Sequence, residues 1–104
     1  MTAGVPDHYL VRLARGPAWD HSRRRRHQVG WDEHAAFMDA LTDEGVVVFG
    51  GPVGEGDGDD VLLVVDVENE ATIRARLADD PWAGEMLTIT SVEPWSVWLR
   101  APDR

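Results

Sequence analysis

One histidine stands on the side of a predicted helix that should be apolar. The segment GWDEHAAFMDALTDEG, residues 30–45, carries apolar residues at helical spacing. At about 100° per residue, His34 shares one sector of the helix with Met38 and Leu41, so it points inward. It is either a core residue whose ring nitrogens bind backbone carbonyls or a general acid or base, because the unperturbed pKa of histidine lies near neutrality.

A histidine that moves protons usually has a carboxylate beside it. The carboxylate fixes one ring N–H and stabilises the charged ring. Asp79 and Asp80 in the segment ADDPW are candidates, since they lie between the second predicted helix and Pro81. Aspartate also favours turns and proline stops helices, so local backbone structure explains the same motif. Both interpretations remain open at this point.

Four strands and two helices are predicted to position these residues. The first helix covers residues 31–44 and ends at Gly45, and the second begins at the N-cap Asn69 and stops before Pro81. A polar loop of unusual length, residues 16–30, precedes the first helix. Alternating or β-branched segments are predicted as strands at residues 8–15, 46–53, 61–67 and 85–95, the third being central.

The order β-α-β-β-α-β is that of an α+β, ferredoxin-like sandwich. In this fold two helices cover one face of a four-stranded antiparallel sheet. One domain, residues 1–104 with a core of about 8–95, accounts for the chain. Side chains alternate between the two faces of a sheet, and neither of the two alternating sets in these strands is consistently polar. The face without helices therefore also carries apolar side chains and needs a cover. An identical subunit is the most economical cover, and we expect a homodimer.

Composition excludes several classes of function. Nineteen acidic residues against ten basic ones give a net charge of −9, which repels nucleic acids and anionic membrane surfaces. The absence of cysteine excludes a thiolate nucleophile and cysteine-ligated metal sites. The other histidines and the acidic segment 55–60, read as a solvated hairpin, lack the spacing of zinc or calcium sites, so we expect no metal. Without an apolar membrane span or a signal segment, a cytoplasmic location is expected.

Two further segments have more than one interpretation. The run of arginines at residues 23–26 either forms a solvated or dimer-contacting loop, or supplies one arginine that binds a substrate carboxylate. Trp95 and Trp98 belong to a C-terminal segment that extends the last strand or covers a partner. Packing in the core of the chain is the default expectation for both tryptophans.

The segments HAAFMDALTDEG, VFGGPV and ADDPW, in this order and spacing, resemble the YciI-like (YCII-related) proteins. The resemblance runs from about Tyr9 to Trp95. It implies a ferredoxin-like fold that forms a dimeric α+β barrel. It also implies an active site built from the helix histidine, here His34, and from the aspartate of the D-P-aromatic motif, here Asp80.

The resemblance further implies a range of reactions. A relative of this type removes chloride from a hydroxylated aromatic ring, and the wider superfamily includes lactone isomerases and cofactor-free monooxygenases. The long arginine-rich first loop departs from the family pattern, as does Trp82, where phenylalanine is commoner. Both departures border the expected pocket, so no relative's substrate is carried over to this chain.

The first functional hypothesis is a small enzyme that needs no cofactor. Asp80 accepts a hydrogen bond from one nitrogen of His34, and the other nitrogen moves a proton on or off a small organic substrate. The reaction is an elimination, isomerisation or hydrolysis. Trp82 forms a wall of the pocket, while the turn at Gly51 and Pro52 brings backbone close to the ligand.

The second hypothesis is a non-catalytic dimeric module that binds a small metabolite or a partner protein in the same cleft. Either hypothesis places a ligand in the cleft, but only the first requires the pairing of histidine with aspartate beside it. A third possibility, a haem-using or cofactor-free monooxygenase of the wider superfamily, has no signature in the sequence.

Overall fold

The computed structural model of the protein describes residues 7–55 and 60–102. It confirms the predicted order of strands and helices, with boundaries that differ by a few residues. A short 3-10 helix, Arg25–His27, lies within the long first loop. The remaining elements are β1 (His8–Arg15), α1 (Trp31–Asp43), β2 (Val47–Pro52), β3 (Asp60–Val65), α2 (Glu70–Leu77) and β4 (Leu87–Trp95).

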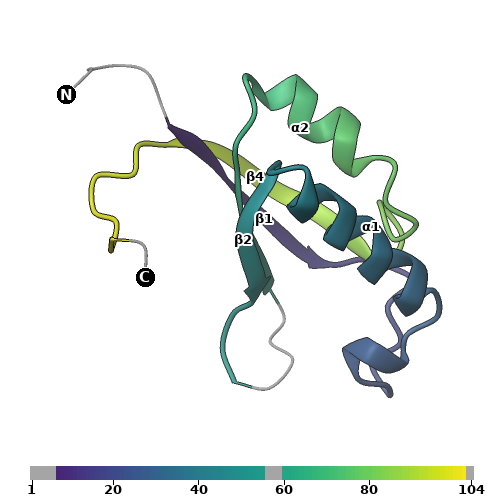
Figure 1. Ribbon diagram of the computed structural model, residues 1–104. Helices are drawn as coiled ribbons and strands as arrows, with labels where there is room; N and C mark the ends of the chain where they lie inside the picture. Colours follow the sequence, from purple (N-terminus) through teal and green to yellow (C-terminus); the bar gives the residue numbers. More distant parts are fainter. Residues whose placement is uncertain (1–6, 56–59, 103–104) are drawn as a thin grey trace.

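The four strands form one antiparallel sheet in the order β2-β3-β1-β4. Strand β3 is central, as predicted, and β2 and β4 form the two edges. Helices α1 and α2 lie on the same side of the sheet (Figure 1). This is the predicted α+β, ferredoxin-like arrangement. The sheet of the single chain is not closed into a barrel, so a closed barrel would need strands from a second chain.

Local sequence signals account for the helix ends. Asn69 caps α2, because its side-chain oxygen accepts a 2.8 Å hydrogen bond from the Thr72 N–H. Gly30 and Gly45 flank α1 with φ angles of 80° and 82°, a left-handed conformation that glycine adopts without strain. The structure has no helix long and apolar enough to cross a lipid bilayer within residues 7–55 and 60–102.

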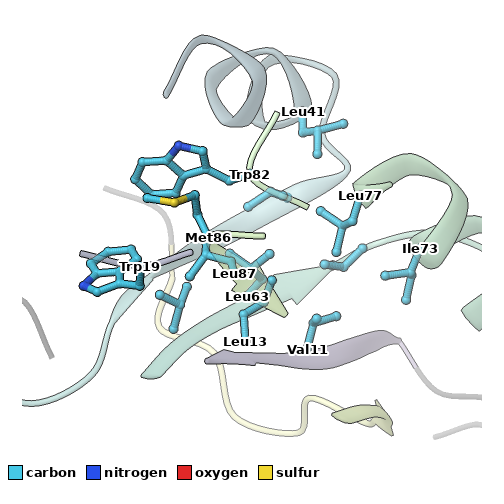
Figure 2. Packing of buried hydrophobic residues seen from close by; sticks show 13 residues of the cluster. Val11, Leu13, Trp19, Leu41, Leu63, Ile73, Leu77, Trp82, Met86 and Leu87 are labelled. Atoms are coloured by element: carbon cyan, nitrogen blue, oxygen red, sulfur yellow. The ribbon is translucent and has the colours of Figure 1, made fainter. Parts of the chain in front are cut away.

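The core fills the space between the two helices and one face of the sheet. Figure 2 shows Trp19, Trp82 and Met86 at one end of this cluster and Ile73 at the other. Leu41 comes from α1, Ile73 and Leu77 come from α2, and the sheet contributes inward residues from its strands. The buried sheet residues are Val11, Leu13, Val47, Val61, Leu63, Val65 and Leu87.

The opposite face of the sheet also carries apolar side chains. Val64 pairs with Leu10 on one side and with Phe49 on the other. Because side chains alternate along a strand and Val11 and Leu63 point into the core, these three point away from the helices. Phe49 is 60% exposed. One face of the sheet is therefore packed by the helices, and the other retains accessible apolar surface.

Two expectations concern residues near the ends of strands. Strand β4 extends through Trp95, but Trp95 and Trp98 are exposed, Trp98 by 75%. The expectation that these tryptophans pack in the core of the chain is wrong, because the chain after β4 leaves the helix-covered face. The predicted hairpin at residues 55–60 lies mostly outside the described residues.

Adjacent glycines at the end of β2 provide a matched test of this packing. An added Cβ at Gly50 would lie 2.6 Å from Leu63 Cδ2 and 2.7 Å from the Leu62 carbonyl oxygen, whereas at Gly51 it meets nothing within 4 Å. We expect Gly50→Ala to lower the free energy of unfolding by about 1–3 kcal/mol. Gly51→Ala should leave it unchanged or raise it by less than about 1 kcal/mol. Urea denaturation measures the free energy of unfolding of both variants. An equal loss of stability in the two variants would contradict the register of β2 against β3.

Candidate active site

His34 and Asp80 meet in the structure, although 46 positions separate them in the chain. His34 Nδ1 lies 2.9 Å from each of the two carboxylate oxygens of Asp80. The two residues are only 8% and 9% exposed. A carboxylate can only accept hydrogen bonds, so Nδ1 carries the hydrogen. The inward direction predicted for His34 is correct, and the carboxylate beside it is that of Asp80, while Asp79 is exposed.

The chain around Asp80 holds its carboxylate in place. The backbone N–H of Asp80 donates to the Leu77 carbonyl at the end of α2, over 3.1 Å. Two residues further on, the Trp82 N–H donates to Asp80 Oδ1 over 2.9 Å. The Ala83 N–H then donates to the Asp80 carbonyl over 2.9 Å. The turn that follows α2 therefore aims the carboxylate at α1 before any ligand binds.

The same turn is attached to the beginning of the long loop. The Gly16 N–H donates to the Met86 carbonyl over 2.8 Å, and the Ala18 N–H donates to the Glu85 carbonyl over 2.9 Å. Glycine is needed at position 16, because a Cβ there would overlap the Glu85 carbonyl group. These contacts fix the turn carrying Asp80 against the residues that follow β1.

Tryptophan rings hold the imidazole of His34. The indole ring of Trp82 stacks on it with a centroid distance of 4.1 Å and an interplanar angle of 6°. Trp31 contacts the same imidazole at 5.8 Å and is tilted by 54°. Trp82 is in turn fixed by a 2.8 Å hydrogen bond from its Nε1–H to the Val29 carbonyl. An indole face beside a histidine stabilises the protonated ring by cation–π attraction.

The second ring nitrogen of His34 is available for chemistry. Nε2 has no hydrogen-bond partner within the described parts of the chain, and it is not one of their fully buried polar atoms without a partner. His34 also lines a large cleft. With the hydrogen on Nδ1, the lone pair of Nε2 is free to accept a proton from a molecule in that cleft.

The cleft lies between the helices and the helix-covered face of the sheet. Its volume is about 790 Å³, which is ample for a small organic ligand. Leu13 and Leu63 of the sheet contribute to its wall, together with Met38 of α1. His34 and Asp80 are among its few polar groups. A mostly apolar cleft with a few convergent polar groups is typical of a small-molecule site.

The other predicted site residues occupy different positions. Gly51 and Pro52 line the cleft from strand β2, and the space beside Gly51 is open. Trp82 is 1% exposed and is not among the residues that line the cleft. It lies behind the imidazole of His34 rather than on the surface that a ligand would touch.

The long loop and the start of α1 each contribute a residue to the cleft, and the loop residue comes from the arginine run for which a substrate-binding arginine was one of the interpretations. Trp31 and Arg25 line the cleft. Arg25 is only 7% exposed, while Arg23, Arg24 and Arg26 are exposed. The presence of two tryptophans, at positions 19 and 31, close to the arginine run was the available signal. Trp19 is buried and Trp31, the first residue of α1, is partly buried; large aromatic rings in and beside a polar loop indicate that the loop packs against the domain.

Internal hydrogen bonds order this loop. The buried side chain of Gln28 accepts from the Asp20 N–H over 3.0 Å. It donates to the carbonyls of Asp20 and Arg23 over 2.7 and 2.9 Å. Hydrogen bonds from the Ser22 hydroxyl and then from its backbone N–H lower the pKa of Asp20. The loop beside the cleft therefore has a defined conformation held by its own hydrogen bonds.

Comparison with known proteins identifies the family of the chain. The described residues hold no group of three or more side chains able to ligate a metal ion. Comparisons with curated proteins and with solved structures find no significant match. A family model, that of the YCII-related domain, matches residues 14–96. This match covers most of the chain and includes both His34 and Asp80. The chain therefore belongs to the family of YCII-related domains.

Proposed function

We propose that this protein is a small enzyme, independent of any cofactor, that uses His34 and Asp80 for acid–base chemistry on a small organic substrate. The observation that carries the proposal is the pairing itself. One nitrogen of the imidazole is 2.9 Å from a buried carboxylate, and the same residue lines an apolar cleft with its other nitrogen unpartnered in the described structure. This is the arrangement that a general base requires.

The roles of the two residues follow from their protonation. Asp80 holds the hydrogen on Nδ1, so Nε2 accepts a proton from the substrate. The imidazolium that forms is stabilised by the negative charge of Asp80 and by the stacked ring of Trp82. His34 then returns the proton to another atom of the substrate in an isomerisation, or to a leaving group in an elimination. In a hydrolysis the proton comes from the attacking water.

The remaining candidate residues support this step. Gly51 lines the cleft without presenting a side chain to it. Pro52 lines the cleft beside it and restricts the backbone. Trp82 acts as a positioning residue. Its indole ring stacks on the imidazole of His34, and its backbone N–H donates a hydrogen bond to Asp80.

Proton exchange provides the test of this function. The probes are α-angelica lactone and phenylpyruvate, each of which has an acidic C–H beside a carbonyl. NMR in D₂O follows the loss of these protons. We expect the wild type to accelerate exchange of at least one probe, and His34→Gln and Asp80→Asn to reduce its rate roughly 10²–10⁴-fold. Asp79→Asn is the control, because the exposed neighbour carries the same charge, and it should retain the wild-type rate.

Two outcomes would count against an enzyme. One is an exchange rate that His34→Gln leaves unchanged. The other is binding of both probes in the cleft, seen as shifts of the tryptophan Nε1–H signals, without any exchange. The second outcome would favour the alternative of a non-catalytic dimeric module that holds a small metabolite or a partner protein.

We also infer that a second copy of the chain covers the open face of the sheet. Leu10, Leu62 and Phe49 present accessible apolar surface there, and apolar surface of this kind is covered most economically by the same surface of an identical subunit. Two sheets packed in this way would form the dimeric barrel expected for the family. The acid–base proposal does not depend on this dimer.

Light scattering at micromolar concentration tests the dimer. The wild type should have the mass of two chains. Leu62→Glu places a charge on the open face and should give the mass of one chain, whereas Ala75→Glu on the exposed side of α2 should leave the dimer intact. Circular dichroism confirms that both variants are folded. A wild type with the mass of one chain contradicts the inference.

A further inference from the structure

We propose that the indole N–H of Trp31 binds the carbonyl oxygen of the substrate and stabilises the negative charge that this oxygen gains when His34 removes a proton from the neighbouring carbon. Trp31 is thus a further catalytic residue, and the substrate has a C–H bond beside a ketone, ester or lactone carbonyl. This inference rests on the proposed function, because it names the substrate class of the same site and the residue that recognises it.

The first support is the position of Trp31 beside the proposed base. Trp31 is the first residue of α1, one helical turn before His34, and it lines the same cleft. The centroids of the indole and imidazole rings lie 5.8 Å apart. Rings this close can contact the same small molecule, which is what a base and a donor that act on adjacent atoms require.

The second support is that the indole N–H of Trp31 is unoccupied. Within residues 7–55 and 60–102, Nε1 of Trp31 has no hydrogen-bond partner, and it is not one of their fully buried polar atoms without a partner. The other tryptophan that contacts the imidazole differs, because Nε1–H of Trp82 donates to the Val29 carbonyl over 2.8 Å. An indole N–H can only donate, so it suits an oxygen that becomes negative.

The third support is that neighbouring side chains hold the Trp31 ring in place. The ring contacts Trp82 with a centroid distance of 5.7 Å and an interplanar angle of 55°. The guanidinium carbon of Arg26 lies 5.9 Å from the centroid of the Trp31 ring. Contact with His34 restrains it further. A donor that is fixed before the substrate binds stabilises a developing charge without the cost of reorganisation.

Other side-chain donors of the cleft are less suited to this task. The Thr42 hydroxyl donates to the Met38 carbonyl over 2.9 Å. Arg74 is half-exposed and forms a 2.8 Å ion pair with Glu70. Thr88 of β4 carries the other hydroxyl among the described residues of the cleft, so its variant competes with that of Trp31 in the test. In a mostly apolar cleft little water competes for a charged oxygen, which strengthens a single hydrogen bond to it.

The chemical step balances with His34 and Trp31 alone. Nε2 of His34 takes the proton, the electron pair of the broken C–H bond forms a double bond to the carbonyl carbon, and the carbonyl π electrons move to the oxygen. The Trp31 N–H donates to this enolate oxygen and keeps its own proton. In an isomerisation the imidazolium returns the proton to another carbon. In an elimination the carbonyl re-forms as a leaving group departs from the next carbon with its electron pair and accepts the proton of His34.

Trp31→Phe tests the catalytic role, since it removes the N–H and keeps an aromatic ring. In the exchange experiment with α-angelica lactone and phenylpyruvate, we expect the rate at saturating probe to fall roughly 10²-fold. The probe concentration at half-maximal rate should change by less than about tenfold, because a hydrogen bond to the neutral carbonyl contributes little net free energy. Trp98→Phe is the matched control. It makes the same change in an exposed tryptophan outside the cleft and should retain the wild-type rate.

A binding experiment tests the same donor without catalysis. Acetophenone and α-methylstyrene have the same shape, but only the first has a carbonyl oxygen where the second has a CH₂ group. Each is titrated into the full-length protein, and ¹H–¹⁵N spectra follow the Trp31 Nε1–H signal, which Trp31→Phe assigns. We expect acetophenone to move this signal further downfield than α-methylstyrene does, because only the carbonyl accepts a hydrogen bond. Trp31→Phe should weaken acetophenone binding about 2–10-fold more than α-methylstyrene binding.

Three results would overturn the proposal. One is a Trp31 signal that the two ligands move alike or not at all. Another is a saturating exchange rate that Trp31→Phe leaves unchanged. The third is a rate that falls in Thr88→Val and not in Trp31→Phe, which would assign the donor to β4. The dispersion of the spectra shows whether each variant keeps the fold.

This inference and the proposed function can fail separately. A Trp31 signal that responds to the carbonyl of acetophenone, in a protein that exchanges no protons, supports Trp31 as the carbonyl-binding residue and removes the acid–base step. Proton exchange that depends on His34 and is equally fast in Trp31→Phe, without that response, removes only the role of Trp31.

Discussion

The hydrogen bond between His34 and Asp80 joins the two halves of the fold. It connects α1 to the turn after α2, and both partners are buried, so each would lose solvation without compensation if the other were absent. The turn satisfies this requirement through the Trp82 N–H, which bonds the same carboxylate. The bond therefore depends on how closely the turn packs against α1. A buried polar pair of this kind at the wall of a cleft is poorly explained by stability alone, since apolar residues would pack there at lower cost.

Three tryptophans connect this pair to the rest of the domain. Trp82 stacks on the imidazole, Trp31 contacts it from the start of α1, and Trp19 carries the contact on to Arg25. The Trp82 side chain is itself fixed by the Val29 carbonyl, which belongs to the long loop. The loop thus performs two tasks. It supports the Trp82 ring that stacks on His34, and it contributes Arg25 to the lining of the same cleft.

Periodicity predicted the elements of this structure but not the loop. The spacing of His34, Met38 and Leu41 was enough to turn the histidine inward, because a helix of known pitch leaves no other choice. The pairing of His34 with Asp80 came from the family resemblance, since spacing cannot relate residues that far apart in sequence. The burial of Arg25 had no periodic signal and depends on tertiary contact with Trp19. Periodicity also could not predict the position of Trp82 behind the imidazole, which is set by packing. It could not predict either that Trp98 lies outside the core.

The most direct measurement of the central claim is the tautomer of the His34 ring, read from two-bond ¹H–¹⁵N correlations, with His34→Gln used to assign the signals. In the wild type the neutral ring should carry its hydrogen on Nδ1 and leave Nε2 as an acceptor. In Asp80→Leu both oxygens that accept from Nδ1–H are removed, and the ring should change to the Nε2–H form. A wild-type ring that already carries its hydrogen on Nε2, or that has the same tautomer in both proteins, would contradict the assignment of His34 as a base positioned by Asp80.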